Sequence, residues 1–141
     1  MFIRLTNGTP ENYTIGQLRR DNPNVSFPKD IPAEVLATFD VYPVKRTPAL
    51  AYNKLTQLIR VIDPMQVDGE WVQQWETLDL PQEEAAENVR SHRANLLSET
   101  DWMALSDNTM TQAWGDYRQA LRDLTAQEGF PHSVEWPTKP E

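Results

Sequence analysis

The apolar residues in the first third of the chain are spaced as in short strands and helices separated by turns. Residues 2–6 alternate like a strand and are followed by Asn7-Gly8, a turn sequence. Residues 13–20 predict one or two helical turns. Residues 41–44 predict an edge strand, because a central strand would not accept Pro43.

A second short helix is predicted over residues 32–38. Pro32 fits its first position, where the missing N–H costs nothing. Its expected buried side consists of three residues: Val35, Leu36 and Phe39.

The clearest local pattern is a β-hairpin. Asp68-Gly69 suits a type I′ turn, and it lies between two strand-like segments, residues 58–62 and 71–78. Pro64 cannot donate a ladder hydrogen bond, so we expect a bulge or bend in the first arm.

After Leu80 the apolar spacing changes to that of a helix. Pro81 opens it, and glutamates in the first turn complement the helix dipole. Side chains recur at steps of three and four residues along one stripe: Ala86, Val89, Arg93, Leu96 and Leu97. The first half of this stripe is only weakly apolar, so we expect it to project into solvent or to lie against another chain.

A second amphipathic helix is expected after residues 107–109, which offer capping side chains. Gly129 suits the left-handed position that ends a helix. We expect Trp102 and Leu105 to fill the seam between the two helices, and residues 133–141 to form an extended tail. One face of the second helix gathers Met110, Trp114, Tyr117, Leu121 and Leu124.

These elements predict an α+β fold with two domains. Residues 1–80 would form a small antiparallel sheet with short helices, and residues 81–141 a helical hairpin with an extended tail. A chain of 141 residues is long enough to bury a hydrophobic core but short for two large domains.

Charge narrows the classes of partner. Thirteen Lys and Arg against 21 Asp and Glu give a net charge of −8, concentrated after residue 50. An acidic chain repels phosphate, so we expect neither a nucleic-acid nor a membrane partner. The sequence offers no membrane-spanning run and no signal-peptide pattern, and the absence of cysteine fits a reducing cytoplasm.

Catalytic and metal-binding patterns are missing as well. No nucleophile lies beside a base at an informative spacing, and the five glycines form no phosphate-binding loop. His92 and His132 lack metal-ligand spacing, and Glu83, Glu84 and Glu87 fit a helix N-terminus better than a cation site. We therefore expect a protein that is not an enzyme and has no cofactor or metal.

Two tryptophans stand outside the predicted apolar faces. Trp71 lies two residues after the hairpin turn, where little sheet can cover it, and Trp136 lies in the extended tail. Tryptophan is enriched among interface anchors, so each either packs back on its own domain or contacts a partner.

The last third of the chain contains three motifs in order: Leu-Leu-x-x-Thr-Asp-Trp at residues 96–102, Trp-x-x-Tyr-Arg-Gln-Ala-Leu-Arg-Asp at residues 114–123 and Trp-Pro-x-Lys-Pro at residues 136–140. Together these motifs resemble those of the bacteriophage tail assembly chaperone family. The resemblance implies a protein of the infected host cytoplasm that binds a tail or tail-fibre protein during assembly.

Several alternatives stay open. The partner would dock as a helix along the apolar stripe or add a strand to a sheet edge, and the weak amphipathicity of the first helix favours the stripe. The protein could instead be a permanent virion component at the baseplate, fibre joint or capsid surface, or form a homo-oligomer. The expected partner-binding residues are Trp71, Ala86, Val89, Leu96 and Trp136.

Overall fold

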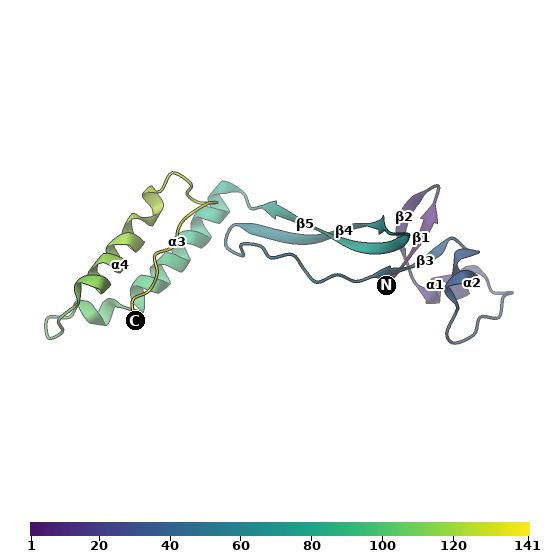
Figure 1. The fold of residues 1–141 in the computed structure, drawn as a ribbon, viewed down its shortest axis with the longest axis horizontal. Helices are drawn as coiled ribbons and strands as arrows, with labels where there is room; N and C mark the ends of the chain where they lie inside the picture. Colours follow the sequence, from purple (N-terminus) through teal and green to yellow (C-terminus); the bar gives the residue numbers. More distant parts are fainter. The chain divides into compact units, whose positions relative to one another are not determined.

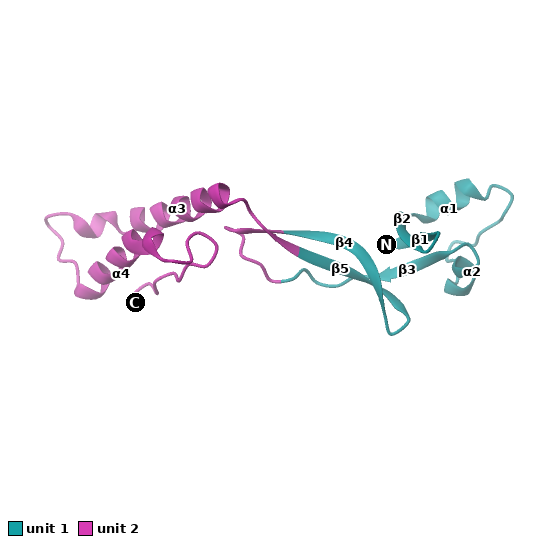
Figure 2. Cartoon of the chain, turned by 90° about the horizontal axis from the view of Figure 1, so that it is seen from above, with its two compact units in different colours: residues 1–50, 59–76 teal, residues 51–58, 77–141 magenta.

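A computed structural model describes all residues, 1–141. The chain forms two compact units, which are coloured separately in Figure 2. Unit 1 consists of residues 1–50 and 59–76, and unit 2 of residues 51–58 and 77–141. The predicted division into domains at residue 80 stays a prediction.

Unit 1 begins with a tight β-hairpin formed by β1 (Phe2–Thr6) and β2 (Thr9–Tyr13) (Figure 1). Asn7 and Gly8 connect the strands with φ values of 53° and 82°, as a type I′ turn requires. The sequence predicted the strand and the turn but not β2, whose residues Thr-Pro-Glu-Asn-Tyr carry little strand propensity.

Two short helices cover the apolar cluster of unit 1. Helix α1 (Ile15–Asp21) begins with a capping box in which Thr14 and Gln17 exchange hydrogen bonds, and helix α2 (Ala33–Ala37) follows Pro32. Both helices were predicted. Leu36 is buried as expected, but Val35 is 39% exposed, because a helix of five residues turns only one narrow face inward. The cluster is centred on Leu18, Leu36 and Val41, with Phe27 and Phe39 packed against it.

The prediction of an edge position for β3 (Val41–Lys45) is wrong. The strand order is β2-β1-β3-β5-β4, so β3 lies between β1 and β5. Proline is tolerated there because Val44 N–H donates to Met1 on the β1 side, which turns position 43 toward β5. The pairing with β5 is registered only at Val44 and Lys45, so Pro43 interrupts no hydrogen bond.

The long hairpin consists of β4 (Gln57–Val67) and β5 (Glu70–Asp79). Its turn is confirmed, since Asp68 and Gly69 have φ values of 51° and 82°. At the open end Gln57 hydrogen-bonds Asp79, and Leu80 N–H donates to Thr56. Counting outward from the two-residue turn, Gln57 would lie opposite Leu80, but it pairs with Asp79 instead. The β4 arm therefore contains one residue more than the β5 arm, in agreement with the bulge predicted for β4.

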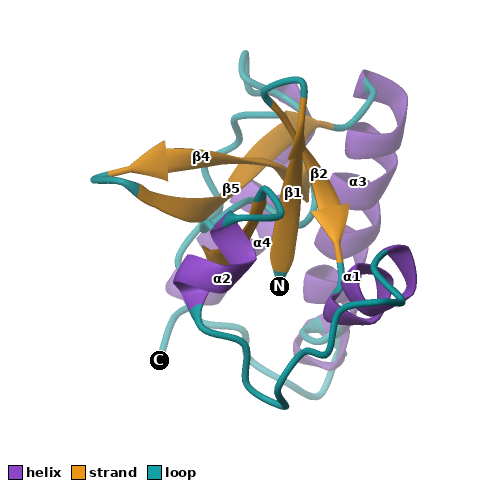
Figure 3. Cartoon of the chain, turned by 90° about the vertical axis from the view of Figure 1, so that its right-hand side faces the viewer, coloured by secondary structure: helices purple, strands orange, loops and turns teal.

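The α+β class is confirmed, but the expected small antiparallel sheet is wrong. Five strands form one sheet, in which β3 and β5 run parallel. The strands are drawn in orange in Figure 3. In unit 1 the sheet curves into a nearly closed barrel, because Val61–Pro64 of β4 face Met1, Ile3, Pro10 and Asn12 across a cavity of about 150 Å³. The curvature of the sheet brings β4 close to the β1–β2 hairpin, an approach that the local sequence pattern does not predict.

Unit 2 is a helical hairpin. Helix α3 (Gln82–Ser98) and helix α4 (Gln112–Asp123) lie side by side, joined by the 3₁₀ turn η1 (Asp101–Ala104), and a second 3₁₀ turn, η2 (Leu124–Ala126), follows α4 (Figure 1). The C-terminal tail returns along α3, where Trp136 packs edge-on against His92 at 4.9 Å and Lys139 pairs with Glu99. No helix of the chain has the length and apolar character needed to cross a bilayer.

Three expectations about this hairpin are corrected. The first half of α3 does not project into solvent, because Ala85, Ala86 and Val89 are buried, and Arg90 lies over Phe130 of the segment that follows α4. Helix α4 begins after Thr111, later than residues 107–109. Gly129 does not adopt a left-handed conformation, and its missing Cβ instead leaves room for the Ser133 carbonyl.

Candidate binding site at the helical hairpin turn

A buried arginine fixes the turn between α3 and α4. The Arg118 side chain is only 7% exposed, and its guanidinium donates to the Leu97 carbonyl at 2.9 Å, to Asp101 Oδ1 at 2.9 Å and to the Thr100 hydroxyl. We call these four residues the Arg118 network. A buried cation is tolerated only when hydrogen-bond acceptors surround it, so the network holds the end of α3 and the start of η1 against α4.

The network explains three residues of the sequence motifs. Arg118 is the donor, and Thr100 and Asp101 are acceptors. The hydrogen bonds therefore join Arg118 to residues 18 and 17 positions earlier in the chain. Sequence reasoning missed this role for Arg118. A signal was present, because Arg118 lies four residues after Trp114 and three before Leu121, on the apolar face of α4.

The prediction that Trp102 and Leu105 fill the helix seam is wrong. Trp102 is 56% exposed and Leu105 is 57% exposed, although both follow directly from the fixed end of α3. Because Arg118 and Thr100 occupy the interior at this level, η1 turns the next apolar side chains outward. The result is a large aromatic side chain displayed on a well-held turn.

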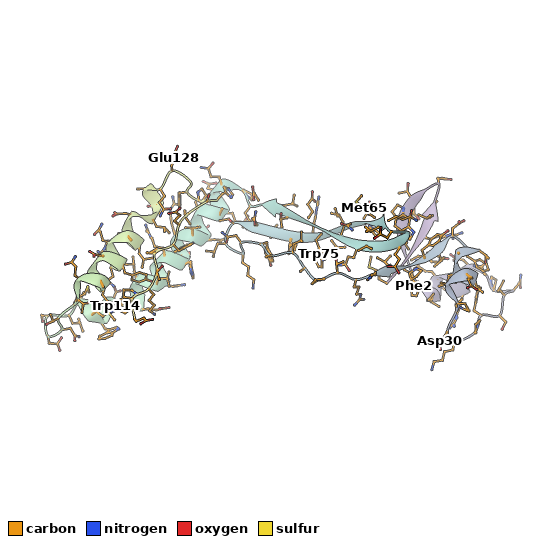
Figure 4. All side chains as sticks on the ribbon, in the orientation of Figure 1. Phe2, Asp30, Met65, Trp75, Trp114 and Glu128 are labelled. Atoms are coloured by element: carbon orange, nitrogen blue, oxygen red, sulfur yellow. The ribbon has the colours of Figure 1, made fainter.

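A pocket of about 200 Å³ lies beside Trp102. Its apolar walls are Trp102 and Met103 of η1 together with Met110 and Trp114 near the start of α4. Figure 4 labels Trp114 on α4, close to the end of the hairpin at which the two helices are joined. We call this hollow the Trp102 pocket. Its size suits one large side chain of a protein partner rather than a cofactor.

The residues predicted for partner binding lie in different surroundings. Ala86 is 6% exposed and Val89 is fully buried, so both belong to the interior of unit 2 in this structure, while Leu96 is half-buried. Their role in binding stays a prediction, and surface contact would require α3 to separate from the chain that covers it.

The two predicted tryptophans belong to different units. Trp71 belongs to unit 1, where it contacts Tyr42 with 6.5 Å between ring centroids and lines a pocket of about 430 Å³. Its indole Nε1 is buried without a hydrogen-bond partner. Trp136 belongs to unit 2 and packs on His92, as the self-packing alternative described.

The titratable groups include no cluster of three or more His, Asp or Glu side chains that could hold a metal ion. The pKa of the Tyr13 phenol is raised by burial and by its hydrogen bond to the Asp21 carboxylate. Tyr13 and Asp21 join β2 to α1 in unit 1, remote in sequence from the hairpin turn.

Comparison with known proteins adds one finding. The model of a family described as phage tail assembly chaperone protein matches residues 86–141. No curated protein and no solved structure matches the chain. The matched segment contains most of α3, the Arg118 network, the Trp102 pocket and the C-terminal tail. Residues 86–141 are therefore similar to the phage tail assembly chaperone family, as their motifs predicted.

Proposed function

We propose that this protein takes part in phage tail assembly without catalysing a reaction, and that it binds another tail component through the turn of its helical hairpin. The observation that carries the proposal is the exposure of Trp102 and Leu105 on a turn held by the Arg118 network. Support for a role in the tail comes from the similarity of residues 86–141 to the phage tail assembly chaperone family.

Trp102 and Leu105 expose apolar surface to water. Covering an exposed tryptophan and a neighbouring leucine removes apolar area from water at about 25 cal/mol per Å², and a turn that is already held in place loses little entropy on binding. Partly enclosed aromatic side chains of this kind are common interface anchors. The partner would be a tail or tail-fibre protein in the infected host cytoplasm.

The test is co-purification during infection. The full chain, carrying an affinity tag, is expressed with the phage that encodes it, and recovered tail proteins are identified and quantified. We expect a tail component to accompany the unchanged chain and to fall at least tenfold with Trp102→Ala, a loss of about 1.4 kcal/mol or more.

Met65→Ala is the matched control. Met65 is 60% exposed and belongs to unit 1, so its truncation removes a comparably exposed side chain from the other unit. Recovery that is unchanged by Trp102→Ala and lost with Met65→Ala would place the binding surface in unit 1 and contradict the proposal.

The alternative that the sequence leaves open is that this protein is a permanent component of the virion. Fixed stoichiometry of the chain in purified virions would select this alternative over a transient assembly role. Light scattering of the isolated chain measures self-association, which would offer a competing way to cover the Trp102 pocket.

A further inference from the structure

We infer that the Trp102 pocket takes a protein segment in which a large apolar side chain is flanked by lysine or arginine. This inference rests on the proposed function and adds the chemistry of the partner. Two tryptophans and two methionines form the apolar walls of the pocket. Methionine side chains adapt to the shape of an inserted group, and tryptophan contributes large contact area.

Two carboxylates are sequence neighbours of residues that line this pocket, and only one of them is paired with a cation. Asp101 directly precedes Trp102, and Asp107 directly precedes Asn108, which lines the pocket. Residues 94–117 contain no Lys or Arg. Arg118 engages one oxygen of Asp101, whereas exposed Asp107 takes part in none of the ion pairs of the chain. The chain beside the pocket lining therefore carries an unpaired negative charge at Asp107.

The start of α4 opposes this charge only in part. Thr111 provides no side-chain cap, so free N–H groups near the pocket contribute roughly half a positive charge. Asp107 alone carries a full negative charge, and Asp101 keeps a second carboxylate oxygen outside its bond to Arg118. The sum favours a cationic flank on the bound segment and disfavours an acidic one.

A second copy of this chain is a poor occupant for the same reason. Unit 2 contains six Lys and Arg against twelve Asp and Glu, a net charge of −6. Two such surfaces repel each other, and the repulsion acts over about 10 Å at moderate salt. A basic segment of another protein meets the apolar and the electrostatic requirement together.

The experiment uses overlapping 15-residue peptides that cover the tail proteins of the phage that encodes this chain. The full-length chain is screened against them, and the best binders are measured in solution by fluorescence polarisation. We expect binders to carry a large apolar residue within two positions of Lys or Arg. Affinity should fall about tenfold with Asp107→Lys and with replacement of the peptide's basic residues by glutamate.

Asp116→Lys is the matched control for charge. Asp116 follows Trp114 by two positions, about 200° around α4, so it lies on the other side of the helix from the pocket. The same charge change there should alter affinity less than twofold. Raising salt from about 50 to 500 mM should weaken binding to the unchanged chain more than to Asp107→Lys.

The outcomes separate this inference from the proposed function. If Asp107→Lys left affinity unchanged, or if no tail peptide bound although a tail component still co-purified through Trp102, the basic segment would be wrong and the assembly role would stand. If no tail component co-purified at all, the proposed function itself would fail.

Discussion

The interiors of the two units are held by different forces. In unit 1 an apolar cluster around Leu18, Leu36 and Val41 is completed by aromatic rings, with Phe27 and Phe39 in edge contact at 5.3 Å. Unit 2 buries aliphatic side chains such as Leu121 as well, but it also buries the guanidinium of Arg118. Apolar contacts tolerate rearrangement, whereas a buried cation depends on particular acceptors. The comparison teaches that the hairpin turn is fixed by hydrogen-bond geometry as well as by packing.

The largest expected effect is that of Arg118→Met. It removes three hydrogen bonds, leaves the Thr100 hydroxyl oxygen without its donor and deprives Asp101 of its ion pair, whereas the Leu97 carbonyl keeps Thr100 as a donor, so we expect unit 2 to lose about 3 kcal/mol. Denaturant unfolding combined with hydrogen exchange of unit 2 amides measures the loss. Arg122→Met is the control, because Arg122 is exposed on the same helix and should change stability by less than about 0.5 kcal/mol. Equal losses in both variants would remove the distinction between the units.

Leu36→Ala tests the apolar interior of unit 1. Leu36 is 3% exposed in the cluster of unit 1, so its truncation creates a cavity and should cost about 2.5 kcal/mol. The adjacent Val35→Ala removes an exposed side chain and should cost less than about 0.5 kcal/mol. Hydrogen exchange should report the loss in unit 1 amides, and a loss confined to unit 2 would contradict the assignment of this core.

Two glycines of unit 2 should respond in opposite directions to alanine. A Cβ at Gly129 would overlap the Ser133 carbonyl, so Gly129→Ala should destabilise the chain by about 1.5 kcal/mol. A Cβ at Gly115 meets nothing within 4 Å inside α4, so Gly115→Ala should stabilise by about 0.5 kcal/mol. Thermal unfolding of the two variants side by side tests both signs, and a loss of stability with Gly115→Ala would show that this position is more crowded than the structure describes.

The smallest effect on stability is expected for Trp102→Ala. The side chain is 56% exposed and lies outside the Arg118 network, so the free energy of unfolding should change by less than about 0.5 kcal/mol. Denaturant unfolding of this variant beside Arg118→Met sharpens the contrast between a displayed residue and a buried one. A loss above about 2 kcal/mol would assign Trp102 to the interior and weaken the proposed binding role.

Much of the local structure could be predicted from the sequence. The turn at Asp68-Gly69, the helix after Pro81 and the apolar face of α4 are as predicted, because each depends on neighbours within a few residues. On that face Tyr117, Leu121 and Leu124 are buried. The position of β3 could not be predicted, since its partners β1 and β5 come from distant parts of the chain.

The candidate site was predicted only in part. The motifs around Trp102 indicated the similarity to the phage tail assembly chaperone family, but the same motifs were expected to fill the helix seam with Trp102 and Leu105. Apolar spacing describes which residues share a face, and it carries no information on which polar group competes for the interior. Here Arg118 and Thr100 took that place because their hydrogen bonds satisfy one another.

The sequence by itself determined the α+β class, the tight turns, the two long helices and the similarity of residues 86–141 to the phage tail assembly chaperone family, because these depend on local conformational preference and on motifs. Only the tertiary structure decided that β3 is central, that Ala86 and Val89 are enclosed, and that Trp102 faces outward. The physical reason is that burial depends on what the rest of the chain places beside a residue. Near Trp102 the buried group is the guanidinium of Arg118, which bonds to Asp101, the residue before Trp102.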